Sequence, residues 1–118
     1  MKKMSDIFYT PRYVYDLVRI YKYSARKWGR PVAKRTLTQI AEVEQHALDD
    51  PDFGKRDAQY HSPIYRYATV RNGQTIFFYR LGDDVVMITA GYSGRAWNRV
   101  MKRIEPQIKA FIDQIETD

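Results

Sequence analysis

The side chains that could take part in chemistry are few, and they lie in the second half of the chain. Tyr92 and Arg95 stand close together where a predicted strand ends, and His61 stands in a loop before the first strand of that sheet. Cleavage of RNA without a metal needs a base for the 2′-hydroxyl, a cation for the phosphate and an acid for the leaving group. His61, Tyr92 and Arg95 are therefore the catalytic candidates if the protein cuts RNA. The simpler alternative is that His61 is an exposed loop residue and that Tyr92 and Arg95 cap a strand or contact a partner.

Two more arginines, Arg66 and Arg80, belong to neighbouring predicted strands on either side of the Asn72-Gly73 turn. If they share a face of the sheet, they form a clamp for a phosphate or a carboxylate. The alternative is a solvated sheet face with no ligand. We therefore take Arg66, Arg80, Tyr92 and Arg95 as candidates for contacts with a partner or target.

The composition excludes several other kinds of site. The chain has no cysteine, so it has no disulfide, no thiol nucleophile and no thiolate metal site. Its two histidines stand in unrelated positions, so we expect no metal site. The acidic run at residues 49–52 is typical of a turn, and no glycine-rich loop is present to hold a phosphate. We expect neither a metal nor a cofactor.

The length and charge indicate a single basic domain spanning residues 1–118. The net charge is +6, and residues 1–40 hold ten Lys or Arg against two acids, whereas residues 41–60 hold six acids against two bases. A basic surface favours an anionic partner, either nucleic acid or an acidic protein segment, unless it is simply solvated. The N-terminus has no signal-peptide core and no apolar run is long enough to cross a membrane, so we expect a cytoplasmic protein with no membrane partner.

The first half of the chain, Ile7–Arg56, is predicted to position the rest. A short edge strand at Ile7–Thr10 leads into a helix that starts at Thr10-Pro11, with a hydroxyl N-cap and proline in the first turn. Gly29 ends this helix, and a second helix starts at Pro31. Apolar residues recur at helical spacing in both, with inner stripes that include Trp28 and Ala41. The two helices should form a hairpin that covers a sheet.

The second half predicts that sheet and a final helix. Strands at residues 64–70, 75–81 and 85–90 should form an antiparallel meander, with a type I′ turn at Asn72-Gly73 and the last strand most central. We expect the fold to be α+β: an N-terminal strand and helical hairpin on a three- to four-stranded antiparallel sheet, with part of the other face free for a ligand. Residues 95–118 form an amphipathic helical segment, kinked or broken near Pro106. The apolar side of this segment packs either on the sheet of the same chain or in a dimer, and we favour the first alternative.

With these elements placed, the chain resembles the RelE/ParE superfamily of bacterial toxins, nearer to its ParE branch. The stretch FYTPRYVYDLVRIYKYSARKWG resembles the opening of ParE toxins, and AKRTLTQIAEVEQHALDDPDFGKR resembles their second helix and the turn after it. The stretch YRYATVRNGQTIFFYRLGDDVVMITAGYSGR resembles their three-stranded meander. The likeness covers roughly residues 6–95, and the order and spacing of the segments carry it.

This resemblance implies the toxin of a type II toxin–antitoxin system, a growth inhibitor of the kind linked to plasmid stabilisation. ParE-like toxins are associated with inhibition of DNA gyrase, and a cognate antitoxin with an acidic segment would neutralise this one. RelE-like toxins instead cut messenger RNA on the ribosome, and the shared fold does not separate the two. A non-toxic binding module on the same fold is a third alternative. A dimer, or a hetero-oligomer with the antitoxin, stays open.

The chain departs from the RNA-cutting branch at several positions. The superfamily often carries His-x-x-Arg after the last strand, and here Tyr92 takes the place of the histidine while Arg95 matches. A basic residue near the start of the penultimate strand is replaced by Thr75. Trp97 takes the place of an aromatic residue that assists cleavage, but it offers no proton and would only stack on a base. Trp97 therefore joins the contact candidates, and we expect a protein that binds its target rather than an enzyme.

Overall fold

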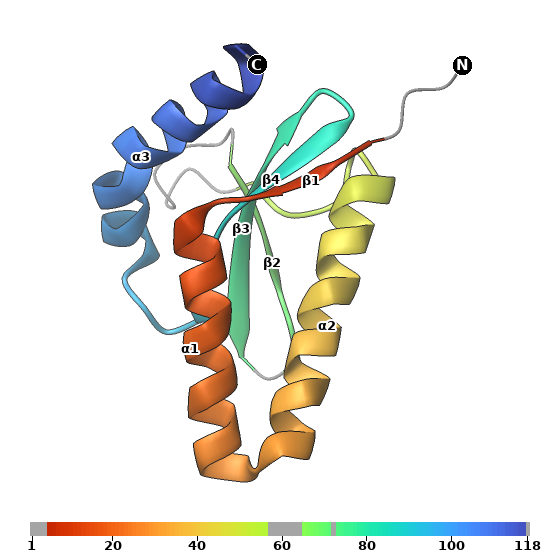
Figure 1. Ribbon diagram of the computed structural model, residues 1–118, viewed down its shortest axis with the longest axis vertical. Coiled ribbons are helices and arrows are strands. Elements are labelled where there is room, and N and C mark those ends of the chain that lie inside the picture. The colour runs from red at the N-terminus through yellow and green to blue at the C-terminus, as the bar shows by residue number, and fades with distance from the viewer. Residues whose placement is uncertain (1–4, 57–64, 72, 118) are drawn as a thin grey trace.

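The computed structural model describes residues 5–56, 65–71 and 73–117, and it has the predicted α+β architecture (Figure 1). Four strands and three helices follow in the order β1 (Ile7–Tyr9), α1 (Pro11–Trp28), α2 (Arg30–Asp49), β2 (Arg66–Thr69), β3 (Gln74–Leu81), β4 (Asp84–Tyr92) and α3 (Trp97–Thr117). Each predicted element is present, with its ends shifted by a few residues at most.

The sheet is mixed rather than wholly antiparallel. Its strand order is β1-β4-β3-β2, with β2, β3 and β4 forming the predicted antiparallel meander and β4 in the interior. The prediction was wrong for β1, which runs parallel to β4 with Ile7 opposite Val85 and Tyr9 opposite Met87. The helical hairpin between β1 and the meander allows this, because a parallel pair needs a long connection whereas an antiparallel pair needs only a turn.

Helices cover both faces of the sheet. α1 and α2 pack on one face and α3 on the other (Figure 1). Phe78 and Met87 belong to the core beneath the hairpin, while Phe77 and Ile88 belong to the core beneath α3. Our expectation of a partly free second face was therefore wrong, because the apolar stripe of α3 needs that face for burial. The expectation that α3 packs on its own sheet is confirmed.

Pro106 does not break α3, which is continuous from Trp97 to Thr117. Proline has no backbone N–H, so the carbonyl of Lys102 lacks its usual helical donor. Pro106 and Lys102 both lie on the exposed side of the helix, where water can solvate that carbonyl. The cost of the proline is therefore small enough for the helix to continue through it.

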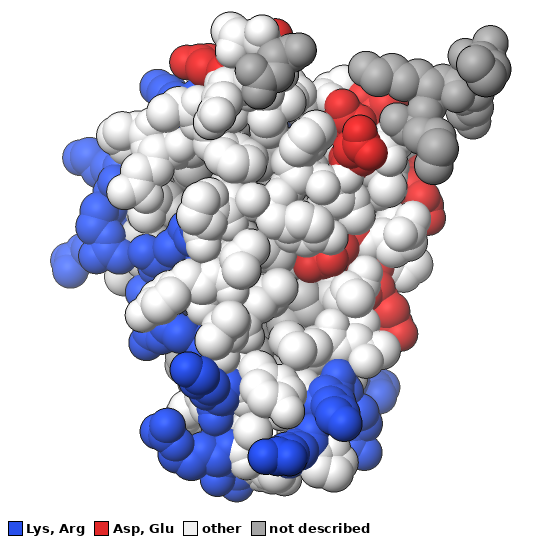
Figure 2. Space-filling model, in the orientation of Figure 1, with Lys and Arg blue, Asp and Glu red and all other residues white. Residues whose placement is uncertain are grey.

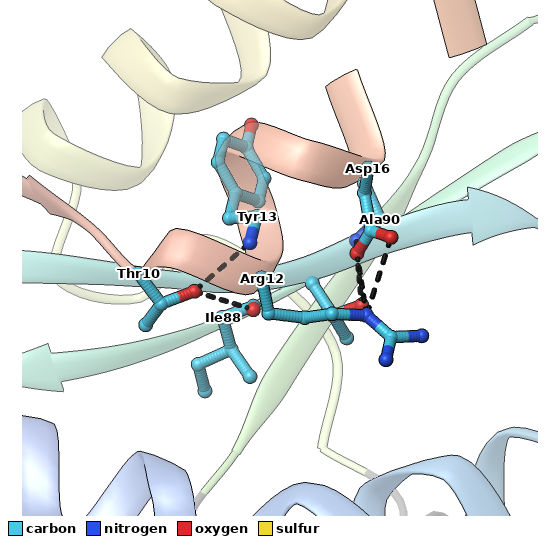
Figure 3. Close-up of polar contacts among 7 residues, drawn as sticks. Thr10, Arg12, Tyr13, Asp16, Ile88 and Ala90 are labelled. Carbon is cyan, nitrogen blue, oxygen red and sulfur yellow. Dashed lines mark hydrogen bonds and ion pairs between the residues drawn. The ribbon is translucent and has the colours of Figure 1, made fainter. Parts of the chain in front are cut away.

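The start of α1 is fixed as the sequence predicted. The Thr10 hydroxyl accepts a hydrogen bond from the backbone N–H of Tyr13 (3.0 Å) and donates one to the carbonyl of Ile88 in β4 (2.8 Å; Figure 3). One side chain thus caps the helix and ties it to the central strand. Between the helices, Gly29 has a φ of 92°, which favours glycine.

At the edges of the apolar stripes predicted for the two helices, some residues are exposed that were expected inside, and others are buried that were not included. Trp28 is 53% exposed and Ala41 is also exposed, whereas Tyr13, Asp16 and Val43 are buried. Tyr13 and Asp16 both carry polar groups, and each can be buried because it has hydrogen-bond partners there. These partners come from elements far away in the chain.

The β2–β3 hairpin forms where it was predicted but has a longer turn. The N–H of Val70 donates to the carbonyl of Gln74 (2.9 Å) and the N–H of Gly73 donates to the carbonyl of Val70 (3.0 Å). The hairpin thus closes at Val70 and Gln74, whereas a two-residue turn at Asn72-Gly73 would close it at Arg71 and Gln74. Gly73 keeps the positive φ (83°) that such loops require, and Asn72 lies outside the described residues.

Candidate functional site

A buried carboxylate joins α1 to the central strand (Figure 3). Asp16 is 3% exposed and accepts hydrogen bonds from the Thr89 hydroxyl (2.5 Å), the Ala90 N–H (3.2 Å) and the Arg12 Nε (3.2 Å). A buried carboxylate needs such partners, because its charge is costly to remove from water. Asp16 therefore locks α1 against β4 and fixes the direction of Arg12, whose terminal nitrogens point away from it.

A second buried carboxylate connects β1, α1 and α2. Glu44 accepts hydrogen bonds from the hydroxyl of Tyr13 (2.6 Å) and from that of Tyr9 (3.1 Å). Burial first, and then the hydrogen bond and charge of Glu44, raise the pKa of Tyr13 far above its ordinary value of 10.0. Tyr13 therefore stays a neutral hydrogen-bond donor, which suits a structural role and not acid–base chemistry.

An apolar groove of about 430 Å³ opens between the first turn of α1 and the second half of α3. Side chains of Ile88, Ile104, Ile108, Ala110 and Phe111 form its apolar walls, and those of Thr10, Pro11, Arg12, Gln107 and Gln114 complete its lining. The guanidinium that Asp16 orients therefore belongs to the lining. Such a site suits an apolar side chain with a carboxylate beside it.

At the end of β4, Tyr92 and Ser93 face different surroundings. Tyr92 is 66% exposed, and its ring lies over Gly94 so closely that a Cβ on Gly94 would stand 2.7 Å from Tyr92 Cε1. Ser93 is held to the neighbouring hairpin, because its N–H donates to the carbonyl of Gly73 (2.8 Å) and its hydroxyl lies 2.7 Å from that of Thr75. Tyr92 is thus a fixed, exposed ring at the edge of the sheet.

Arg95 and Trp97 are brought together, but only Arg95 is open to a ligand. The Arg95 guanidinium carbon lies 5.4 Å from the centre of the Trp97 ring, in cation–π contact. Trp97 is 2% exposed and packs against Phe77, with ring centres 5.0 Å apart. The expectation that Trp97 stacks on a base was wrong, since its ring belongs to the core. The ring instead supports the Arg95 guanidinium that lies against it.

Arg66 and Arg80 share a face of the sheet, as predicted, but both are used by the protein itself. Arg66 is 8% exposed and donates to the carbonyls of Pro51 and Phe53 (3.2 Å to the latter), and Arg80 donates to the carbonyl of Ala47 (2.7 Å). Burial, then the charges of Arg56 and Arg80, lower the pKa of Arg66. The pair caps the end of α2 and the turn after it, where carbonyls lack helical partners.

Only one of the two histidines belongs to the described residues, and it lies on α2. His61 lies outside the described residues. His46 is exposed on the last turn of α2, and its ring stacks on Phe53 with centres 5.6 Å apart. Within the described ranges no group of His, Asp and Glu has the arrangement of a metal site, and no helix is long and apolar enough to cross a membrane.

Charge is strongly separated over the surface. Figure 2 shows Lys and Arg gathered at the tip of the helical hairpin and on the side of α3, with Asp and Glu along the side of α2. Residues 17–41, which make up the part of the hairpin that leads to and from its tip, include seven Lys or Arg and no acid. The positive charge that the sequence concentrates in its N-terminal part thus lies mainly on the outer side of one end of the molecule.

Several residues of these surfaces were missed from the sequence. Arg12 and Asp16 stand four residues apart in the predicted first helix, which was a visible signal for an ion pair, but nothing local showed that Asp16 is buried. Phe111 was placed in an apolar stripe and not in a groove. The groove depends on how far α3 lies from α1, which spacing in the sequence does not reveal.

A family of toxins matches this chain over most of its length. The family model described as "ParE toxin of type II toxin-antitoxin system, parDE" matches residues 7–97. The match spans most of the chain, and the protein belongs to the ParE toxin family. It ends at the first residue of α3, so one wall of the groove lies almost wholly beyond it.

A solved structure described as the chromosomal ParDE TA system from P. aeruginosa has a similar fold. The alignment has a TM-score of 0.63 and 18% sequence identity, and it covers 75% of this chain and 96% of that chain. At this level of identity the likeness concerns the fold alone. Among curated proteins, none matches the chain.

Proposed function

We propose that this ParE-family toxin arrests growth by binding DNA gyrase, without cutting RNA itself. The observation that carries the proposal is the family match over residues 7–97, because ParE-like toxins are associated with gyrase inhibition. The use of its arginines supports it. Arg66 and Arg80 donate to carbonyls at the end of α2 and in the turn after it, so both are engaged where an RNA-cutting site would need cations for the phosphate. Arg95 lies on the ring of Trp97 after the end of β4, where its partly exposed side chain is available for a contact.

The competing RNA-cutting function would place its chemistry at the end of β4. There Tyr92 and Arg95 offer a phenol and a guanidinium, and the neighbouring Thr75 and Ser93 hydroxyls are hydrogen-bonded to each other. Neither a phenol nor a guanidinium is an effective general base for the 2′-hydroxyl of RNA. This composition favours binding over cleavage.

A cognate antitoxin is expected to use the groove between α1 and α3. Its apolar walls suit an anchoring apolar side chain, and Arg12, held in place by Asp16, suits an adjacent carboxylate. An acidic antitoxin segment offers both. The groove would then contribute to the choice of antitoxin, because its walls must fit the side chain that enters it.

Plasmid topology in cells tests the proposed target. Induction of the toxin should stop growth and shift a reporter plasmid from its supercoiled to its relaxed form, while messenger RNAs stay intact. Cells that carry a toxin-resistant gyrase serve as the control and should keep both growth and supercoiling. Fragmented messages with unchanged plasmid topology would refute gyrase as the target, and normal growth of the induced cells would refute the toxin activity itself.

A further inference from the structure

The outer face of α1 leaves an unusual number of large apolar side chains in water. Seven such residues are strongly exposed in the described ranges, and five of them lie on this helix: Val14, Tyr15, Val18, Tyr23 and Trp28. Each of the three aromatic residues has more than half of its surface exposed. Aromatic rings contribute most when buried, so a helix face that keeps several of them in water marks an interaction surface.

These rings alternate with cations along one row of the helix. Tyr15, Arg19, Tyr23 and Lys27 follow each other at four-residue spacing, which places successive side chains about 6 Å apart along the axis. The Arg19 guanidinium lies 5.8 Å from the Tyr15 ring, and the Lys27 Nζ lies 5.5 Å from the Tyr23 ring and 5.0 Å from the Trp28 ring. We call these five residues the α1 ridge. Each ring of the ridge has a cation beside it.

The charge of the surroundings limits what can bind there. The ridge continues into the basic tip of the hairpin, where residues 17–41 hold no acid (Figure 2). A second copy of the same face would bring like charges together, which opposes a dimer through it. The partner must therefore be an anion that also buries aromatic rings.

We propose that the α1 ridge binds a nucleic-acid strand with unpaired bases. Such a strand offers one phosphate and one base per nucleotide, which matches the alternation of cation and ring. An acidic amphipathic peptide would need a continuous apolar stripe, and here the exposed Lys22 and Arg26 interrupt it. This inference goes beyond gyrase inhibition and does not depend on it.

The first test measures binding of labelled thymidine and uridine oligonucleotides of about 12 nucleotides to the purified full chain by fluorescence anisotropy. Both should bind at low salt and quench the fluorescence of Trp28, which is the exposed one of the two tryptophans. Equal affinity for the two oligonucleotides indicates that the ridge recognises only the bases and phosphates that DNA and RNA share. A preference for one of them identifies the natural ligand as DNA or as RNA. Absence of binding by both oligonucleotides would overturn the proposal.

Two double variants separate the ridge from charge in general. Tyr23→Ala with Trp28→Ala keeps the net charge and should weaken binding about tenfold or more, because base stacking is lost. Arg19→Ala with Lys27→Ala should weaken binding more than Lys34→Ala with Arg35→Ala, an exposed pair on α2 that removes the same charge. All these residues are surface-exposed, so each variant should fold, and circular dichroism is the check.

The other outcomes count against the proposal. If the aromatic variant binds as tightly as the unaltered chain, the rings take no part and the surface is only basic. If duplex DNA binds as tightly as the single strand, no unpaired base is read. If polyglutamate quenches Trp28 as strongly as the oligonucleotides at equal charge, the ridge accepts acidic protein instead.

Discussion

The variant Asp16→Ala is expected to lose about 3–5 kcal/mol of unfolding free energy, a large share of the total for a domain of this size. The substitution removes the acceptor for the Thr89 hydroxyl, the Ala90 N–H and the Arg12 Nε at once. Two of these donors are buried, and an unsatisfied buried donor costs more than the bond itself was worth. Urea denaturation followed by circular dichroism measures the change.

Asp83→Ala provides the matched control for this experiment. Asp83 stands exposed in the turn between β3 and β4, and its loss should change the unfolding free energy by no more than about 0.5 kcal/mol. If Asp16→Ala is as mild as this control, Asp16 is not the junction between α1 and β4 that the hydrogen bonds indicate.

Ala110→Glu is expected to weaken binding of the cognate antitoxin about 100-fold while leaving toxicity intact. Ala110 lines the groove on the exposed side of α3, so glutamate both fills the groove and repels an acidic segment. Calorimetric titration of the purified toxin with its antitoxin measures the affinity. In cells, co-expressed antitoxin should no longer restore growth.

The control for Ala110→Glu is Ala41→Glu, which makes the same chemical change at an exposed position of α2. It should leave the affinity for the antitoxin within about twofold of the original value, since surface changes away from a site have small effects. Equal losses for the two variants would mean that net charge governs antitoxin binding and that the groove does not.

Elements with a local signal were predicted well. Thr10-Pro11 marks the start of α1 and Gly29 marks its end, because helix caps use characteristic residue types. The apolar run of β4 marks the interior position of this strand in the sheet, because a buried strand is apolar along its length. The strand-end pair Tyr92 and Arg95 was also placed correctly at the end of the sheet.

Features that depend on distant partners were not predictable. The parallel pairing of β1 with β4 requires knowledge of where the hairpin returns the chain, and three residues of strand are too few to show it. The burial of Asp16 depends on the Thr89 hydroxyl, which belongs to β4 and lies far away in the sequence. Trp97 begins the apolar stripe of the final helix, so its burial against Phe77 agrees with that stripe and not with its assignment as a contact residue.

Purified DNA gyrase provides the most direct test of the claim that this chain acts by binding a protein target. Gyrase acting on relaxed plasmid should lose its supercoiling activity when the toxin is added. If the toxin is first mixed with its cognate antitoxin, gyrase should keep that activity. In parallel, the toxin mixed with programmed ribosomes should leave the message intact. Unimpaired supercoiling together with a cleaved message would contradict the proposal and return the chemistry to the candidates Tyr92, Arg95 and His61.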